Sequence, residues 1–213
     1  MAVIRPFRAV RPAHDAADRV AAVPYDVVDV DEARALAAGN PLSFLHVSRA
    51  EIDLPAGVHP HDDSVYRTAA ERYRALKREA PFVQEDDPSF YLYHLEVGGH
   101  GQTGVAACYS LAEYDRGVIR KHERTRKDKE DDRTRHIIEL RAQTGPVFLI
   151  HRPNDQIDEL ATRVRSTSES LVDFDAPDGV RHAIWRVSSD DAPALSQAFA
   201  SVFDSLDARP RCV

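Results

Sequence analysis

Several features that define whole classes of proteins are missing or scarce in this chain of 213 residues. No apolar run approaches the roughly 18–20 residues that cross a membrane. The first twelve residues carry three arginines and two prolines and lack the apolar core of a secretory signal. Two cysteines, Cys108 and Cys212, do not make a disulfide framework. These absences predict a cytoplasmic protein that has no membrane partner.

Basic residues are also fewer than acidic residues. The chain has 28 basic and 35 acidic residues, a net charge of −7 and a pI of about 5.8. Binding to nucleic acid is driven by clustered positive charge, so we expect no DNA partner and instead a small-molecule substrate. The composition, 43% hydrophobic and 30% charged, is that of a globular protein. It leaves the oligomeric state open.

The pattern of apolar residues and turn residues predicts an α+β fold with mixed or antiparallel sheets, hairpins and flanking helices. Helices are expected over residues 31–38, 64–79, 126–142, 155–166 and 191–206, and strands over residues 42–47, 90–97, 104–111, 147–150, 171–175 and 180–187. The glycine-rich turn at 98–101 and the turn at 176–179 each join two strands into a hairpin.

We expect two regions, residues 1–113 and residues 114–213, each of them α+β in character. After the last predicted helix come a turn at 208–211 and what resembles the first residues of a strand. A domain that ends there would lack the remainder of that strand. The second region is therefore predicted to continue in a longer protein.

The segment 120–135, RKHERTRKDKEDDRTR, carries eight basic and five acidic side chains and is the strongest candidate for chemistry. If Ile137 and Leu140 face the core, stepping back along the helix places charged residues on the same stripe. Those residues are Arg133, Glu130 and Arg126, with Glu123 just outside the helix start. Charges that face inward are costly unless they are paired or meet a ligand, and a basic helix start attracts phosphate. The alternative is a solvated helix held by pairs such as Arg126–Glu130 and Lys127–Asp131.

Two shorter motifs are weaker candidates. The stretch His59-Pro60-His61-Asp62-Asp63 has the residue types of a metal site, but its loop defines no ligand geometry. In Pro24-Tyr25-Asp26, the aspartate could serve a site or cap a turn. Cys108 is expected in the core. Neither a phosphate-binding P-loop nor a G-x-S-x-G nucleophile elbow occurs in the sequence.

The stretches IRPFRAVRP, VAAVPYDVV, NPLSFLHVSRAEIDLP, GVIRKHERTRKDKEDDR and AQTGPVFLI together resemble the bacterial and archaeal family known as domain of unknown function 1015. The resemblance extends over essentially the whole chain. Members of that family are longer and continue into a stretch with a Gly-His-His-Arg motif. This is a second reason to expect a longer protein here.

The pair His122-Glu123 and the strand-like Pro146-Val147-Phe148-Leu149 also resemble free-serine kinases of the ParB/sulfiredoxin-like fold. The resemblance implies a ParB-like region at 114–213 and a nucleotide, ATP or ADP with Mg²⁺, as phosphate donor. It implies that Glu123 is the general base for a substrate hydroxyl, with His122 beside it. The residues expected to bind phosphate or substrate are Lys121, Arg124, Arg126, Glu130, Arg133, Tyr25 and Asp26.

The sequence therefore predicts a nucleotide-dependent phosphotransferase that acts on a small hydroxylated metabolite such as serine, or the N-terminal part of such an enzyme. Two alternatives stay open. One is a non-catalytic regulatory module that binds a nucleotide or another ligand, since ParB-like folds also serve as switches. The other is a metal-assisted phosphatase that uses His59, His61 and nearby aspartates.

Overall fold

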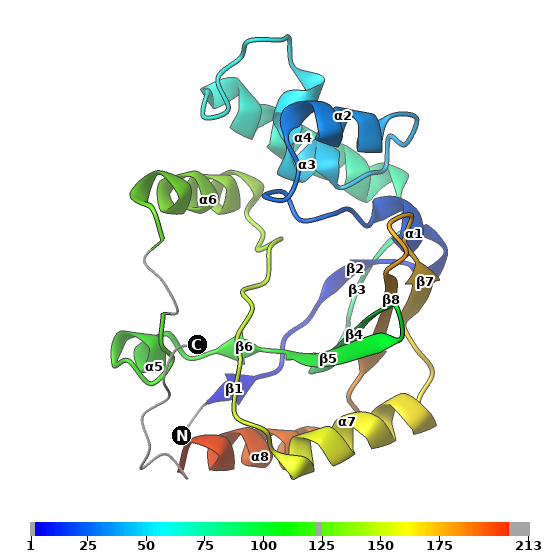
Figure 1. Ribbon diagram of the computed structural model, residues 1–213, viewed down its shortest axis with the longest axis vertical. Helices are drawn as coiled ribbons and strands as arrows, with labels where there is room; N and C mark the ends of the chain where they lie inside the picture. The colour runs from blue at the N-terminus through cyan, green and yellow to red at the C-terminus, as the bar shows by residue number, and fades with distance from the viewer. Residues whose placement is uncertain (1–2, 122–124, 205–213) are drawn as a thin grey trace. The chain divides into compact units, whose positions relative to one another are not determined.

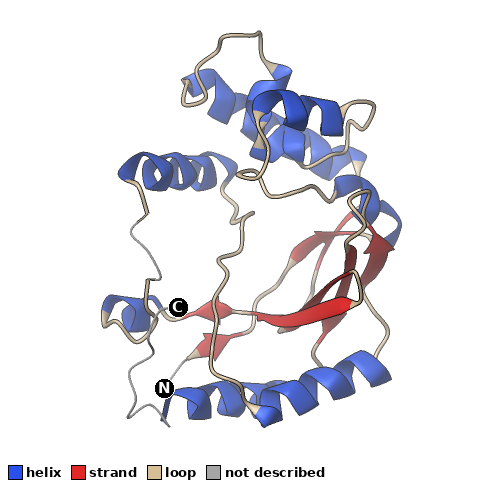
Figure 2. Cartoon of the chain, viewed as in Figure 1, coloured by secondary structure: helices blue, strands red, loops and turns tan. Residues whose placement is uncertain are grey.

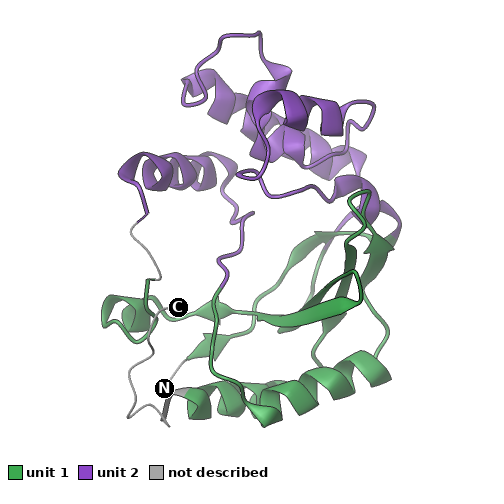
Figure 3. Ribbon diagram, in the orientation of Figure 1, with its two compact units in different colours: residues 1–14, 84–124, 149–213 green, residues 15–83, 125–148 purple. Residues whose placement is uncertain are grey.

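The computed structural model describes residues 3–121 and 125–204 (Figure 1). The chain folds into two compact units, each assembled from separate stretches (Figure 3). The first, here called the sheet unit, comprises residues 1–14, 84–124 and 149–213, and the second, the helical unit, comprises residues 15–83 and 125–148. The predicted boundary between residues 113 and 114 lies inside the sheet unit.

The sheet unit is built on a four-stranded antiparallel sheet with strand order β5-β4-β8-β7. Its strands are β4 (Tyr91–Val97), β5 (His100–Ala106), β7 (Val172–Asp175) and β8 (Arg181–Arg186). Both predicted hairpins are confirmed, because β4 pairs with β5 and β7 pairs with β8. The smaller elements of this unit are β1 (Ile4–Arg5), β2 (Val10–Pro12), β6 (Cys108–Tyr109) and α5 (Leu111–Asp115).

Helices α7 (Asp155–Thr167) and α8 (Ala192–Asp204) cover one face of this sheet (Figure 1). Alternation along the strands turns Leu92 and Trp185 toward the helices, where they join one core with Val164 and Leu195. The α+β fold with antiparallel sheets and flanking helices is thus confirmed.

The helical unit contains a long helix, α4 (Asp63–Glu79), surrounded by shorter elements (Figure 2). These are η1 (His14–Ala16), α1 (Ala17–Val20), α2 (Val30–Ala37), α3 (Leu45–Ser48), η2 (Ala50–Asp53) and α6 (Lys127–Leu140). The strand β3 (Phe82–Gln84) follows α4 where the chain passes into the sheet unit. Tyr73 and Leu76 of α4 share a core with Leu140 of α6, so the two helices pack on each other although about 60 residues separate them in the sequence.

Two predicted strands are wrong. Residues 45–48 form the helix α3, because the Asn40 and Ser43 side chains accept hydrogen bonds from the backbone amides two residues further along and start a helical turn. Residues 147–150 have no strand partner in the part of the chain that the structure describes, and Phe148 is exposed. Short apolar runs fit a strand or a buried helix equally well, and partners that are distant in sequence decide between them.

The buried face of α6 also differs from the predicted one. Ile137 is 37% exposed, whereas Asp132, His136 and Leu140 are buried. The prediction assumed that an isoleucine outranks an aspartate and a histidine for burial, but polar groups with hydrogen-bond partners can occupy a core face. Cys108, predicted in the core, is exposed. Among the described residues, no helix is both long and apolar enough to cross a membrane.

Candidate functional site

The inward face of α6 carries a carboxylate that holds several other side chains. Asp132 is 9% exposed, and its Oδ1 accepts a hydrogen bond of 2.7 Å from the Tyr66 hydroxyl. The same oxygen lies 3.2 Å from His61 Nδ1. Oδ2 accepts from Nε and Nη2 of Arg133, at 2.8 and 2.6 Å. We call these four residues of the helical unit the Asp132 cluster.

The electrostatics of the cluster keep Asp132 ionised. Burial by itself disfavours the charged form, but hydrogen bonds from Tyr66 and Arg133 outweigh it, so the pKa of Asp132 is lowered. Burial and the nearby carboxylate raise the pKa of Tyr66 to about 12. At neutral pH the cluster therefore holds a carboxylate that accepts hydrogen bonds and a phenol that donates one.

His61 of the cluster and the nearby His59 have different hydrogen-bond partners at Nδ1. The ionised Asp132 accepts from Nδ1 of His61, so in the neutral form of that ring Nε2 is the acceptor. Nδ1 of His59 accepts a hydrogen bond of 3.1 Å from the backbone N–H of His61, so the neutral His59 ring carries its proton on Nε2. The ring centroids are 5.4 Å apart. Two neighbouring rings thus carry a nitrogen that can accept a proton and an N–H donor, which are the groups that general acid–base chemistry uses.

Arg133 connects the cluster to the loop that contains Tyr25. Its guanidinium carbon lies 4.0 Å from the centroid of the Tyr25 ring, in a cation–π contact. Nη1 of Arg49 donates a 3.1 Å hydrogen bond to the carbonyl of Tyr25 and fixes that loop. The Arg133 side chain is 30% exposed, which leaves part of its planar fork accessible to a carboxylate or phosphate.

One turn further along α6, His136 anchors the helix. Its Nε2 lies 3.0 Å from the Val47 carbonyl and donates a hydrogen bond to it. Burial is the main reason that the pKa of His136 is lowered, so the ring is neutral at physiological pH. His136 therefore positions α6 against the segment around α3, so that Asp132 reaches Tyr66.

The structure brings two of the predicted site residues together, since Arg133 stacks on Tyr25. Asp26, Arg126 and Glu130 are exposed, and Arg126 pairs with Asp128 at 2.7 Å. Lys121 belongs to the sheet unit, where its Nζ lies 5.2 Å from the Tyr114 ring centroid. The predicted residues His122, Glu123 and Arg124 lie outside the described residues.

Sequence reasoning missed Asp132, Tyr66 and His136. The available signal was the spacing 132–136–140, which puts an acid, a histidine and a leucine on one helical stripe. For His59 and His61 the sequence suggested a metal site. Within the described residues, no three side chains of the types His, Cys, Asp and Glu are grouped so as to hold a metal ion.

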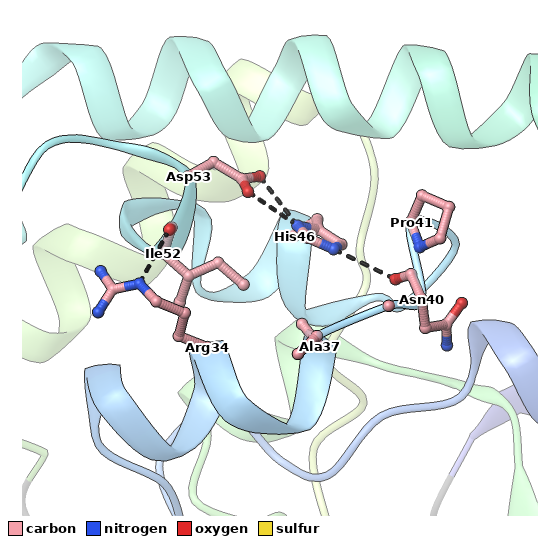
Figure 4. A pocket seen from close by; sticks show the side chains of 9 residues that line it. Arg34, Ala37, Asn40, Pro41, His46, Ile52 and Asp53 are labelled. Atoms are coloured by element: carbon pink, nitrogen blue, oxygen red, sulfur yellow. Dashed lines mark hydrogen bonds and ion pairs between the residues drawn. The ribbon is translucent and has the colours of Figure 1, made fainter.

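A pocket of the helical unit, of about 420 Å³, surrounds His46 (Figure 4). Nδ1 of His46 faces both carboxylate oxygens of Asp53 at 3.0 and 2.9 Å, and Nε2 faces the Asn40 carbonyl at 3.2 Å. Because both ring nitrogens are committed to acceptors, neither is available as a base or a metal ligand. His46 is a structural link, and the Asp132 cluster is the stronger candidate.

Comparison with known proteins gives one match. A family model described as "Protein of unknown function (DUF1015)" matches residues 4–206. No curated protein and no solved structure matches the chain.

Proposed function

The chain belongs to the DUF1015 family, and for it we propose a phosphotransferase activity centred on the Asp132 cluster. The reaction is transfer of a phosphoryl group to the hydroxyl of a small metabolite such as serine. The observation that carries the proposal is that one buried carboxylate, Asp132, holds both an imidazole and a guanidinium. Acid–base groups beside a cation are what phosphoryl transfer to a hydroxyl needs.

The roles follow from the hydrogen bonds. Nε2 of His61 accepts the proton of the substrate hydroxyl. At the same time the hydroxyl oxygen forms a bond to phosphorus, and the bond between phosphorus and the donor's leaving group breaks. Arg133, held by Asp132 and Tyr25, offers its free N–H groups to anionic oxygens of substrate or donor. His59, whose ring centroid is 5.4 Å from that of His61, presents an N–H donor. ATP or ADP with Mg²⁺ is the donor that the resemblance to free-serine kinases implies.

A direct assay tests this proposal. The full gene product is incubated with serine, Mg²⁺ and ATP or ADP, and phosphoserine is quantified by ³¹P NMR. We expect turnover that His61→Gln lowers by about 10²–10⁴-fold, the usual contribution of a general base. His100→Gln, which removes an exposed histidine of the sheet unit, is the matched control and keeps the rate.

A second pair of variants separates the two candidate bases. If Glu123→Gln abolishes turnover while His61→Gln leaves it intact, the base is Glu123 and our assignment of His61 is wrong. Arg133→Gln is expected to raise the KM more than Arg135→Gln does, because Arg135 is tied to Asp63 at 2.6 Å. Equal effects of these two variants would contradict the role of Arg133.

A non-catalytic ligand-binding module is the second candidate. It is favoured by one observation, namely that both oxygens of Asp132 are already engaged by protein groups, as in a structural link. In that case nucleotide or serine raises the melting temperature of the chain, no product forms, and His61→Gln does not change the shift. The presence or absence of phosphoserine decides between the two functions.

A further inference from the structure

A separate pocket of about 370 Å³ lies in the sheet unit, beside the last turns of α7. It is lined by His94, Thr162, Arg165, Ser166, Arg181 and Trp185. Its volume is that of a small-metabolite site. The apolar core formed by Leu92 and Val164 gives way here to polar side chains on the same face of the sheet.

Three side chains at this pocket form a closed ring of hydrogen bonds. Arg165 donates from Nη1 to Thr103 Oγ1 at 3.0 Å and from Nη2 to His94 Nε2 at 3.3 Å. Since Nε2 accepts, the proton of His94 is on Nδ1, which donates to Thr103 Oγ1 at 2.9 Å. Thr103 Oγ1 accepts twice, so its own O–H is left to donate. The remaining N–H groups of Arg165 are donors as well.

The position of His94 is built into the sheet. The residue is 5% exposed, and its ring lies over Gly101 of the neighbouring strand. A Cβ at residue 101 would stand 2.6 Å from His94 Cε1, so the ring occupies space that any other residue there would fill. The hydrogen bonds among His94, Thr103 and Arg165 are therefore held in a fixed arrangement. This favours binding, because these side chains lose little conformational entropy when a ligand binds.

Two guanidiniums line the pocket, and among the described residues only one of them is paired with a carboxylate. Arg181 is neutralised by Asp173 through hydrogen bonds of 2.9 and 2.8 Å. Arg165 has no carboxylate within 4.0 Å in the described part of the chain, and its two observed acceptors are neutral. The Glu96 carboxylate lies 3.5 Å from His94 Nε2, outside ion-pair distance of Arg165. Arg165 thus faces the pocket with N–H groups that no carboxylate of the described residues pairs with.

We propose that this pocket binds a small carboxylate metabolite. The carboxylate takes the free edge of the Arg165 guanidinium, whose planar fork matches two oxygens. A monoanion pairs with the one guanidinium that has no carboxylate partner among the described residues, whereas a phosphate dianion would bring a second negative charge near Glu96. The hydroxyls of Thr162 and Ser166 line the same wall and suit a ligand that carries a hydroxyl group. This site lies in the other unit from the Asp132 cluster, and its test is independent of the proposed function.

Trp185 provides the readout, because it is the single tryptophan of the chain. The full chain is titrated with acetate, lactate and inorganic phosphate while tryptophan emission is recorded. We expect a saturable change with the two carboxylates, tighter for lactate, with a Kd on the order of 1 mM for a ligand of this size. Arg165→Gln should weaken binding at least ~10-fold, since it removes a charge-assisted pair.

Arg163→Gln is the matched control, because Arg163 is an exposed arginine of the same helix that pairs with Asp191. It should bind as the native chain does, and Arg165→Lys should bind with intermediate affinity. Circular dichroism and the melting temperature show whether each variant is folded. The proposal is overturned if no carboxylate gives a saturable change, if phosphate binds more tightly than lactate, or if Arg163→Gln weakens binding as much as Arg165→Gln.

Discussion

At the scale of single residues, Asp132 is expected to matter most for the helical unit. Asp132→Asn leaves the Arg133 guanidinium without its carboxylate and puts an amide beside it, so we expect a loss of about 1–3 kcal/mol in the free energy of unfolding. The exposed neighbour Asp131 pairs with Lys127, and Asp131→Asn should change stability by no more than about 0.5 kcal/mol. Urea denaturation at pH 7 measures both. A small effect of Asp132→Asn would mean that the cluster is not formed in solution.

The same carboxylate predicts a dependence on acid. Because the pKa of Asp132 is lowered in the folded state, its stabilisation is present above the unfolded value of about 4 and is lost as the pH falls through the folded value. The native chain should therefore lose stability below about pH 4 more steeply than Asp132→Asn does. Denaturation midpoints between pH 5 and pH 2 test this. Parallel curves for the two proteins would contradict the lowered pKa.

His136 acts in a different pH window. Its folded pKa is below the unfolded value of about 6.5, so between these two values the unfolded chain binds a proton that the folded chain does not. Stability should decline as the pH falls below about 6.5, and His136→Gln should remove that part of the decline. The comparison variant is His100→Gln at an exposed position, which should keep the native pH profile.

At the scale of elements, the buried face of α6 can be tested directly. Leu140 is 7% exposed and shares a core with Leu76, so Leu140→Ala should cost about 2–5 kcal/mol. Ile138 is 66% exposed, and Ile138→Ser should cost no more than about 0.5 kcal/mol. A larger loss for Ile138→Ser than for Leu140→Ala, measured by urea denaturation, would contradict the buried face of α6 that the structure shows.

Strand β5 depends on a glycine where it passes His94. Gly101→Ala introduces a methyl group that meets the imidazole at 2.6 Å, and we expect a loss of about 1–3 kcal/mol from overpacking. Gly104 of the same strand has no atom within 4 Å of its Cβ position, so Gly104→Ala should be tolerated. Thermal unfolding of the two variants gives the comparison. Equal melting temperatures would mean that the His94 ring does not pack against Gly101.

At the scale of the whole molecule, each unit has its own hydrophobic core, although each is made of separate stretches of the chain. Local stability should follow these cores. Leu140→Ala should speed amide hydrogen exchange mainly in α4 and α6, and Leu195→Ala mainly in β4, β8 and α7. Exchange that rises uniformly across the chain in both variants would show that the two units unfold together.

The sequence by itself determined the elements whose signals are local. The helix at 63–79 and the hairpins formed by β4 with β5 and by β7 with β8 follow from apolar periodicity and from turn residues between them. It also singled out Arg133 and Tyr25, which the structure brings into contact. The α+β class follows from the order of these elements.

Tertiary structure alone decided which face of α6 is buried and how the chain divides into units. A histidine and an aspartate occupy the inner face of α6 because Val47 and Tyr66, more than 60 residues away, supply their hydrogen bonds. Without partners those polar groups would be too costly to bury, so a pattern of local hydrophobicity assigns them to solvent.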